Sequence, residues 1–402
     1  MHVLYFHQYF STPSGSSGTR SYEMARALVE KGHSVTMVCG SSQLSKTELD
    51  QDMHNGVRSG LVDGINVVEI DLEYSNHNSL LKRSLLFLQF AWRSIGIARK
   101  TDYDVLFATT TPLTAGLPGI FMRLLKPGKP FVFEVRDLWP ELPKAMGVIS
   151  NPVVLWAMGL LETISYKTAH HCIALSPGIQ QGILKKKPKA AVSMIPNGCD
   201  LEFFSATERG RNNKLKAVFT GAHGQANGLD AVLNAAAELK RRNDQSIELH
   251  FIGDGKLKPE LVSRAKREQL DNCVFLDPVP KKELRDQLAE YDVGLMILAN
   301  VSAFYYGTSP NKFFDYLACG LPVLNNYPGW LSQLISENDC GIAIAPDDAK
   351  LFADALQELA SDPDRRIAMG RAARQLGEEQ FNRARLAASF IECLEAVHTN
   401  QT

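Results

Sequence analysis

Short apolar segments that read as β-strands alternate with longer segments of helical periodicity, and this alternation limits the fold more than any other feature of the chain. Alternating strands and helices are typical of an open, doubly wound α/β sheet with parallel strands. The predicted strands form two sets, Val3–His7, Ser34–Cys39, Val67–Ile70, Val105–Ala108, Phe131–Glu134, His171–Leu175 and Val192–Ile195, then Ala217–Gly221, Glu248–Ile252, Cys273–Leu276, Val293–Leu298, Val323–Asn325 and Gly341–Ile344.

The length of 402 residues exceeds what one hydrophobic core usually serves, so the two sets of strands predict two domains. The turn cluster Ile195–Asp200 and the polar stretch Ser205–Lys214 lie between the sets, and we place a hinge there. The predicted parts are a Rossmann-like domain over 1–200, a second over 201–380 and a C-terminal helix over 381–402 that packs back on the first. We expect the two domains to face each other across a cleft at the carboxyl ends of their strands, where such sheets bind ligands.

The composition is that of a soluble globular protein, with 45% hydrophobic and 22% charged residues. Seven cysteines without a C-x-x-C pair argue against a disulfide framework and a zinc site, which predicts a reducing cytoplasm and no bound metal. A net charge of −1 and the lack of a recognition motif disfavour nucleic acid as a partner. Charge is uneven, however. Residues 1–200 carry 20 Lys and Arg against 16 Asp and Glu, and the rest carries 23 against 28, so the first half is the candidate for a basic docking face.

A glycine-containing loop, Pro13–Arg20, connects the first strand to a predicted helix. Backbone amides before a helix can approach an anion, and Gly18 is our candidate contact to a phosphate. The spacing differs from G-x-G-x-x-G, so it does not support a dinucleotide site. A plain connecting loop remains an equal alternative.

Charged residues gather where the predicted strand Phe131–Glu134 ends, in the segment Glu134–Glu141. The carboxyl end of a buried strand is a usual place for ligand contacts, so we favour a functional role. Trp139 can stack on a sugar ring, with Glu134 as a neighbouring polar contact. The alternative is that Asp137 caps a helix and pairs with Arg136.

The second set of strands contains two further glycine turns. Phe219–Gly228 places Gly221, His223 and Gly224 before a predicted helix, and Gly253 follows another strand. Each of these turns is weak evidence for a site when taken singly.

The stretch from Ser309 to Val323 carries the strongest prediction of a nucleotide site. Pro310 suits a helix start, and a first turn with Asn311 and Lys312 can bind a phosphate. Asp315 follows one turn later and can accept hydrogen bonds from both ribose hydroxyls. The alternative is an exposed helix end on which Lys312 and Asp315 form an ion pair.

Taken in order, these segments resemble glycosyltransferase family 4, the retaining enzymes of the GT-B fold. The matching segments span nearly the whole chain and are Lys31–Val35, Ile195–Asp200, Gly253–Gly255 and Asp315–Val323. Glu134–Glu141 and Ser309–Lys312 more narrowly resemble bacterial O-antigen and capsule enzymes, among them N-acetyl-L-fucosamine transferases. The resemblance implies two Rossmann-like domains and a UDP-sugar as co-substrate.

The chain departs from this family in three places. Asp315 replaces the second glutamate of the family's Glu-x7-Glu pattern, whereas Gly307 stands at the first, so Tyr305, Tyr306 and Thr308 become candidates for contact with the sugar. Gln225 and Asn227 occupy the loop where the family tends to carry an arginine and a lysine, and we hypothesise that Lys312 neutralises the diphosphate instead. Arg136 stands where a histidine is frequent.

The motifs and the family resemblance together give the set of predicted site residues. The predicted catalytic residues are Asp137, Arg136 and Lys312. The predicted contacts to the nucleotide sugar are Gly18, Gly221, His223, Gly224, Gly253, Ser309, Asn311 and Asp315. The predicted contacts to the acceptor or sugar are Glu134, Trp139 and Tyr306.

Residues 80–130 predict contact with an anionic bilayer, because eight Lys and Arg flank large apolar side chains there and Lys185–Lys189 adds further basic residues. Such a surface implies that the acceptor is a polyprenyl-diphosphate-linked saccharide, which the protein would bind at the inner face of the plasma membrane. The alternative is ordinary packing, since Leu81, Leu85, Leu88, Trp92 and Ile95 fall at helical spacing and would face the core. No apolar run approaches the roughly 18–20 residues that span a membrane.

The predicted reaction is retaining glycosyl transfer without a metal, from a UDP-sugar that carries N-acetyl-L-fucosamine or another N-acetylamino sugar. Two other classes of function stay open. A UDP-sugar epimerase of the same architecture would turn over its substrate without an acceptor, and a non-catalytic nucleotide-binding module would bind UDP and release none.

Overall fold

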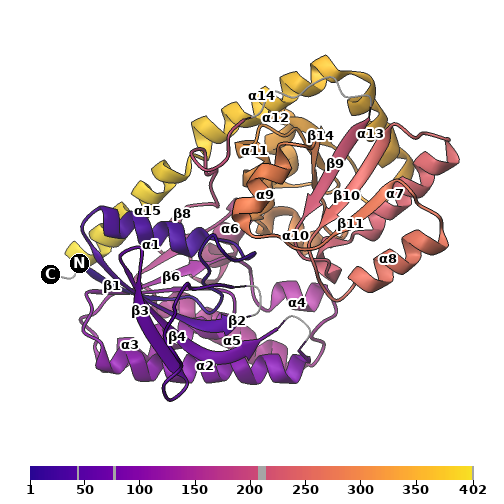
Figure 1. Cartoon of the computed structure of the whole chain (residues 1–402). Helices are drawn as coiled ribbons and strands as arrows, with labels where there is room; N and C mark the ends of the chain where they lie inside the picture. The colour runs from indigo at the N-terminus through magenta and orange to yellow at the C-terminus, as the bar shows by residue number, and fades with distance from the viewer. Residues whose placement is uncertain (43–44, 76–77, 207–213, 401–402) are drawn as a thin grey trace. The chain divides into compact units, whose positions relative to one another are not determined.

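The structure is a computed structural model that describes residues 1–42, 45–75, 78–206 and 214–400. The chain divides into two compact units (Figure 1). The first comprises Met1–Pro196, Gly307–Ser309 and Ala384–Thr402, and the second comprises Asn197–Tyr306 and Pro310–Arg383. The hinge predicted over Ser205–Lys214 includes residues 207–213, which lie outside the described residues.

The first unit is built on an eight-stranded sheet in the order β3-β4-β2-β1-β5-β6-β7-β8. All neighbouring strands are parallel except β3 and β4, which form an antiparallel hairpin at the edge. The strands are β1 (His2–Phe6), β2 (Ser34–Ser42), β3 (Val57–Val62), β4 (Ile65–Tyr74), β5 (Val105–Thr109), β6 (Phe131–Val135), β7 (His171–Ala174) and β8 (Val192–Met194).

The prediction of a sheet with parallel strands only is wrong at this edge. Strand β3 was not predicted, and it pairs with β4 in an antiparallel hairpin. Its turn is Asp63-Gly64, with both residues at positive φ, and this pair is the usual signal of a tight hairpin. Most of β3 is partly exposed, so it lacks the apolar run by which the other strands were recognised.

Helices cover both faces of this sheet. On one face, α1 (Arg20–Glu30) and α15 (Arg383–Thr399) share a core with β1, where the Phe390 ring lies 5.1 Å from that of Phe107. On the other face, the helices are α2 (Leu80–Lys100), α3 (Leu117–Leu125), α5 (Pro152–Thr168) and α6 (Pro177–Lys186), and the short α4 (Glu141–Ala145) precedes α5. Residues of α15 thus complete the core of the first unit.

The second unit has a six-stranded parallel sheet in the order β11-β10-β9-β12-β13-β14. Its strands are β9 (Leu215–Thr220), β10 (Ile247–Ile252), β11 (Cys273–Leu276), β12 (Val293–Met296), β13 (Val323–Asn325) and β14 (Gly341–Ala343). The helices along this part of the chain are α7 (Asp230–Arg241), α8 (Lys258–Arg267), α9 (Lys281–Leu288), α10 (Ser302–Gly307), α11 (Asn311–Ala318), α12 (Trp330–Glu337), α13 (Ala349–Ser361) and α14 (Pro363–Gln380). The predicted α/β class with two Rossmann-like domains is confirmed.

The alternative in which the apolar stripe of α2 faces the core is wrong for four of its five residues. Leu81, Leu85, Leu88 and Trp92 are exposed, and of the stripe only Ile95 is buried. The side chains that face the core are instead Leu86, Phe90 and Ile95. In the part of the chain that the structure describes, no helix combines the length and the apolarity needed to cross a bilayer.

Candidate active site

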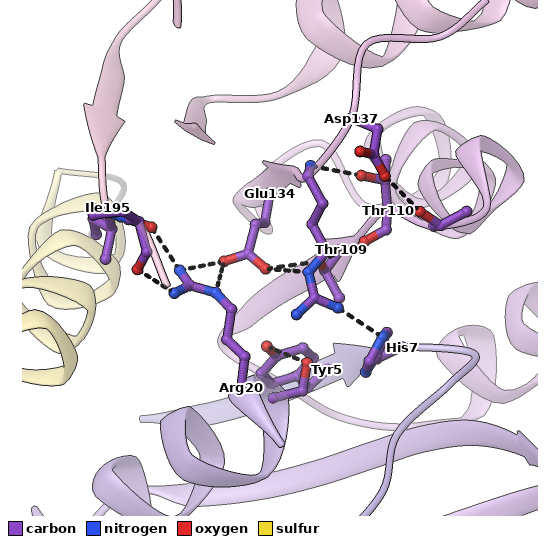
Figure 2. A network of polar contacts seen from close by, with 12 residues as sticks. Tyr5, His7, Arg20, Thr109, Thr110, Glu134, Asp137 and Ile195 are labelled. Carbon is purple, nitrogen blue, oxygen red and sulfur yellow. Dashed lines mark hydrogen bonds and ion pairs between the residues drawn. The ribbon is translucent and has the colours of Figure 1, made fainter. Parts of the chain in front are cut away.

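Glu134 is the centre of a polar network in the first unit (Figure 2). It lies in β6 with no exposed surface, and its Oε2 accepts hydrogen bonds from Arg20 Nε at 3.0 Å and Nη2 at 2.8 Å. Thr109 Oγ1 donates to its Oε1 at 2.7 Å. Burial opposes ionisation, but the charges of Arg20 and Arg136 hold the pKa of Glu134 below its ordinary value. Glu134 is therefore an anion without surface contact, which leaves it unable to touch a ligand as the side chains lie here.

Arg20 also binds the chain at the end of β8. Its guanidinium donates to the carbonyls of Pro196 at 2.6 Å and Ile195 at 2.8 Å (Figure 2). Arg20 was not selected as a site residue from the sequence. A signal was present, because Arg20 lies four residues before Met24 and eight before Leu28, on the face of α1 that is buried.

Arg136 is held between the ends of β1 and β6. Its Nη1 lies 3.1 Å from Nε2 of His7, and its backbone amide donates to Thr110 Oγ1 at 2.7 Å. Burial and the charge of Arg136 lower the pKa of His7 well below its ordinary value. The ring is then neutral and Nε2 accepts the hydrogen bond, while Nδ1 has no partner among the described residues. His7 is a second residue that the sequence analysis did not select.

Asp137 accepts a hydrogen bond from Thr111 Oγ1 at 3.1 Å. Burial raises the pKa of Asp137, although Thr111 and Arg136 act in the opposite direction. The alternative interpretation of Asp137 as a helix cap is wrong, since α4 begins at Glu141 with Pro140 before it. Trp139 is half-buried between Asp137 and this helix. Gly18 is exposed two residues before α1 begins.

Lys312 lies in the first turn of α11, against the loop that follows β9. Its Nζ is 3.7 Å from the centre of the Phe219 ring and donates to Asn227 Oδ1 at 3.1 Å. A Cβ added at Gly221 would come within 3.5 Å of Nζ, so the glycine leaves room for the lysine. No carboxylate pairs with Lys312 among the described residues, and burial lowers its pKa to about 7.

The two predicted glycine turns of the second unit lie against each other. Gly253 has a φ of +148°, and a Cβ there would lie 1.9 Å from the carbonyl oxygen of Gly221. Only glycine fits this approach of one backbone to another. Gly224 precedes a short 3-10 turn over Gln225–Asn227.

His223 is fully buried in the loop that follows β9. Its ring lies 6.1 Å to 6.3 Å from the rings of Phe219, Phe251 and Phe275. Neither ring nitrogen has a hydrogen-bond partner among the described residues, and burial lowers its pKa to about 4. His223 is thus neutral and closed off from the surface, so its predicted contact with a nucleotide sugar is not seen as the side chains lie here.

Asp315 is buried in α11 and pairs with Lys281, the first residue of α9, at 3.5 Å. The Lys281 ammonium also lies 5.3 Å from the centre of the Phe204 ring. The alternative ion pair between Lys312 and Asp315 is therefore wrong, because each side chain has another partner. Lys281 was not selected from the sequence, where nothing connects it with a residue 34 positions away.

The remaining predicted residues lie on either side of the start of α11. Ser309 is buried, Asn311 is the first residue of the helix, and Tyr306 on α10 is half-exposed. Each unit thus brings one group together. Glu134, Arg136 and Asp137 meet in the first, and Lys312 meets Gly221 in the second, with Gly253 beside that glycine.

Comparison with known proteins assigns both halves to one class of enzyme. The family model described as "Glycosyltransferase Family 4" matches residues 17–203, and the model described as "Glycosyl transferases group 1" matches residues 214–362. The chain is a glycosyltransferase with one domain of each kind.

Curated relatives belong to the same class. A D-inositol 3-phosphate glycosyltransferase of Corynebacterium urealyticum is 31% identical over 205 residues, which are 46% of this chain and 47% of the relative. The match thus spans about half of that relative's length. The "Probable glycosyltransferase WbjE" of Pseudomonas aeruginosa is 24% identical over 301 residues, 71% of this chain and 74% of the relative.

Solved structures resemble the chain along nearly its whole length. Sucrose-phosphate synthase from Thermosynechococcus elongatus has a TM-score of 0.77 at 16% identity and covers 99% of both chains. HepE from Anabaena, solved in complex with UDP-glucose, has a TM-score of 0.72 at 16% identity and covers 98% of this chain and 100% of its own. At such identities the likeness shows the shared fold of GT-B glycosyltransferases.

Proposed function

We propose that the chain transfers a sugar from a UDP-sugar to a polyprenyl-diphosphate-linked saccharide with retention of configuration, in the synthesis of a surface polysaccharide. An N-acetylamino sugar such as N-acetyl-L-fucosamine is the proposed transferred group. The observation that carries the donor half of this proposal is the position of Lys312, a lysine without a carboxylate partner among the described residues, beside the Gly221 loop.

The donor diphosphate needs positive charge or aligned donors, because the leaving nucleotide gains negative charge as the glycosidic bond breaks. Lys312 supplies a cation held between Phe219 and Asn227, and the backbone of Gly221 has no side chain to keep an anion away. HepE, which has the same fold, binds UDP-glucose in its own crystal structure. We propose the same class of donor for this chain.

Asp315 is the proposed ribose contact. Its Oδ1 is buried and makes no hydrogen bond among the described residues, so it keeps capacity for a hydroxyl donor. Lys281 Nζ, 3.5 Å from Oδ1, limits the orientation of the carboxylate. We propose Lys281 as a positioning residue for Asp315.

Arg136 and Asp137 are the proposed polar contacts of the first unit to the sugar or the acceptor. Glu134 and His7 fix the Arg136 guanidinium from two directions, so Glu134 acts through Arg136. The raised pKa of Asp137 brings it nearer to the range in which a carboxyl group exchanges a proton with a hydroxyl. Trp139 and Tyr306 stay predictions for stacking on a sugar.

We propose that transfer needs no metal, since Lys312 takes over the neutralisation of the diphosphate that a cation provides elsewhere. D-x-D triplets occur at Asp50–Asp52, Asp102–Asp104 and Asp362–Asp364. Asp104 accepts a hydrogen bond from the backbone amide of His2, and the side chain of Asp362 caps α14, so the last two triplets have structural tasks. Asp50 and Asp52 are exposed. We also propose that the enzyme acts at the cytoplasmic face of the plasma membrane, where a lipid-linked acceptor is presented.

The test is a donor screen that measures nucleotide release with and without lipid-linked acceptors. Acceptor-dependent release of UDP supports transfer, acceptor-free conversion of the sugar indicates an epimerase, and binding without release indicates a nucleotide-binding module. Lys312→Ala should reduce transfer by orders of magnitude, whereas Lys282→Ala, an exposed lysine on α9, serves as the matched control. An unchanged kcat in Asp137→Asn would remove Asp137 from the mechanism.

A further inference from the structure

The first unit carries a broad apolar surface on three neighbouring helices, of which α3 packs against both α2 and α5. We define the three-helix surface by ten of the exposed large apolar side chains on these helices, Leu81, Leu85, Leu88, Trp92, Phe121, Leu124, Leu125, Val153, Trp156 and Leu160. Monomeric soluble proteins rarely expose apolar patches of more than a few hundred Å² (about 300–600 Å²), and larger ones mark a site of interaction. A surface of this kind needs a partner.

Regular spacing shows that these side chains share one side of each helix. Leu81, Leu85, Leu88 and Trp92 follow at intervals of four, three and four residues, which is one stripe of a helix. On α5, Trp156 and Leu160 repeat the interval of four. Both helices bury a second side in the core, so they are apolar on two sides, unlike an ordinary helix at a protein surface.

The charges on the same helices are almost all positive. The basic residues are five on α2, one on α3 and one on α5, namely Lys82, Arg83, Arg93, Arg99, Lys100, Arg123 and Lys167. The single acidic residue is Glu162, which is buried and bonded to Tyr166 and Lys186. No exposed anion therefore opposes an approaching negative surface from these three helices.

We infer that the three-helix surface docks on an anionic lipid bilayer. Basic side chains around apolar ones suit a headgroup layer above acyl chains, because lysine and arginine are attracted to anionic headgroups while the apolar side chains enter the acyl region. Trp92 and Trp156, 73% and 68% exposed, have the amphipathic rings that gather at this depth. A second copy of the chain docked through the same surface would set these positive charges against one another.

This inference extends the proposed function, since a bilayer would present the lipid-linked acceptor, but docking itself involves neither donor nor acceptor. The experiment is co-sedimentation of the full chain with vesicles of equal parts phosphatidylcholine and phosphatidylglycerol, with phosphatidylcholine alone for comparison. We expect retention on the anionic vesicles only. Leu85→Ser/Leu88→Ser and Arg99→Glu/Lys100→Glu should each weaken retention by about tenfold or more.

Leu61→Ser is the matched control, because Leu61 is 75% exposed on β3 of the same unit but belongs to none of the three helices. A second readout is quenching of tryptophan fluorescence by brominated lipid. The chain has four tryptophans, so Trp92→Phe/Trp156→Phe should lose most quenching yet still sediment with vesicles. The Phe variant keeps the surface apolar, which separates insertion depth from binding.

Three results would overturn the docking inference. In the first, wild-type protein stays in the supernatant. In the second, Leu61→Ser weakens retention on vesicles as much as the other variants do. In the third, vesicles retain nothing and the wild-type protein is a stable dimer that the Leu85→Ser/Leu88→Ser substitutions convert to monomers. The last would identify a second copy of the chain as the occupant. UDP binding measured on the same variants should be unchanged, so a failure of docking leaves the proposed transfer standing.

Discussion

If Lys312 binds the donor diphosphate as proposed, its lowered pKa makes the affinity for the donor fall as the pH rises. In the free protein the pKa is about 7, because the ammonium is buried beside Phe219 and, among the described residues, has only the Asn227 oxygen as a hydrogen-bond acceptor. A bound diphosphate supplies the missing anion and raises that pKa. Above pH 7 binding must therefore take up a proton, and affinity falls as the pH rises. Below pH 7 the lysine is already charged and affinity levels off.

The size of the effect follows from the fraction of charged lysine. At pH 7 about half of the free protein carries the charge, and at pH 9 about one hundredth does. If only the charged form binds, the Kd for UDP rises by about fiftyfold between these two values. UDP itself changes little over this range, because a terminal phosphate loses its second proton near pH 6 (about one unit lower).

Titration calorimetry of UDP from pH 6 to 9, in buffers of different ionisation enthalpy, gives both the Kd and the number of protons taken up. We expect uptake that approaches one proton per UDP at pH 8.5 to 9 (about two units above the pKa). In Lys312→Arg the side chain stays charged, so the slope should vanish even if affinity changes. A wild-type Kd that is flat from pH 7 to 9 would refute the role of Lys312 as the diphosphate cation.

Three further predictions concern other contacts. Arg20→Met should lower the free energy of unfolding by about 3–5 kcal/mol in urea denaturation, because it leaves Glu134 buried without its main partner, whereas Arg26→Met on the exposed face of α1 should cost about 0.5 kcal/mol or less. Asp315→Ala should raise the donor KM about tenfold with a smaller effect on kcat, and an unchanged KM would exclude the ribose contact. Gly253→Ala should cost roughly 2–4 kcal/mol, seen as a lower Tm, since its Cβ would overlap a backbone oxygen.

The positions of the strands along the chain could be predicted where each strand is an uninterrupted apolar run. The parallel strands Val105–Thr109 and Cys273–Leu276 were found in this way, the second with its bounds as observed. The edge strand Val57–Val62 was missed because five of its six residues are partly or fully exposed and its apolar residues form no run. A local signal existed in the turn Asp63-Gly64, so this error came from reliance on hydrophobicity alone.

Site residues could be predicted where a local pattern places them and not where a distant partner decides their role. Gly221 and Lys312 were selected for a glycine turn and a helix start, but their proximity depends on how strand β9 and helix α11 pack. The ion pair between Lys281 and Asp315 joins residues 34 positions apart, and its geometry has no local trace. The exposed stripe of α2 was left undecided because periodicity gives the spacing of apolar residues but not which stripe faces the core.

Arg136 shows why the first unit needed the structure most. Arg136 lies near two carboxylate residues in the sequence, and one interpretation of the sequence paired it with its neighbour Asp137. Instead, Arg20 fills most of the hydrogen-bonding capacity of Glu134, and Nε2 of a neutral His7 accepts a hydrogen bond from Nη1 of Arg136. Asp137 is thereby left with Thr111 as its hydrogen-bond partner among the described residues, and with a raised pKa. Arg136 already lies 3.8 Å from Glu134, and loss of Arg20 would draw it closer to that carboxylate, so the pKa of Asp137 depends on a second, buried arginine as well as on Arg136.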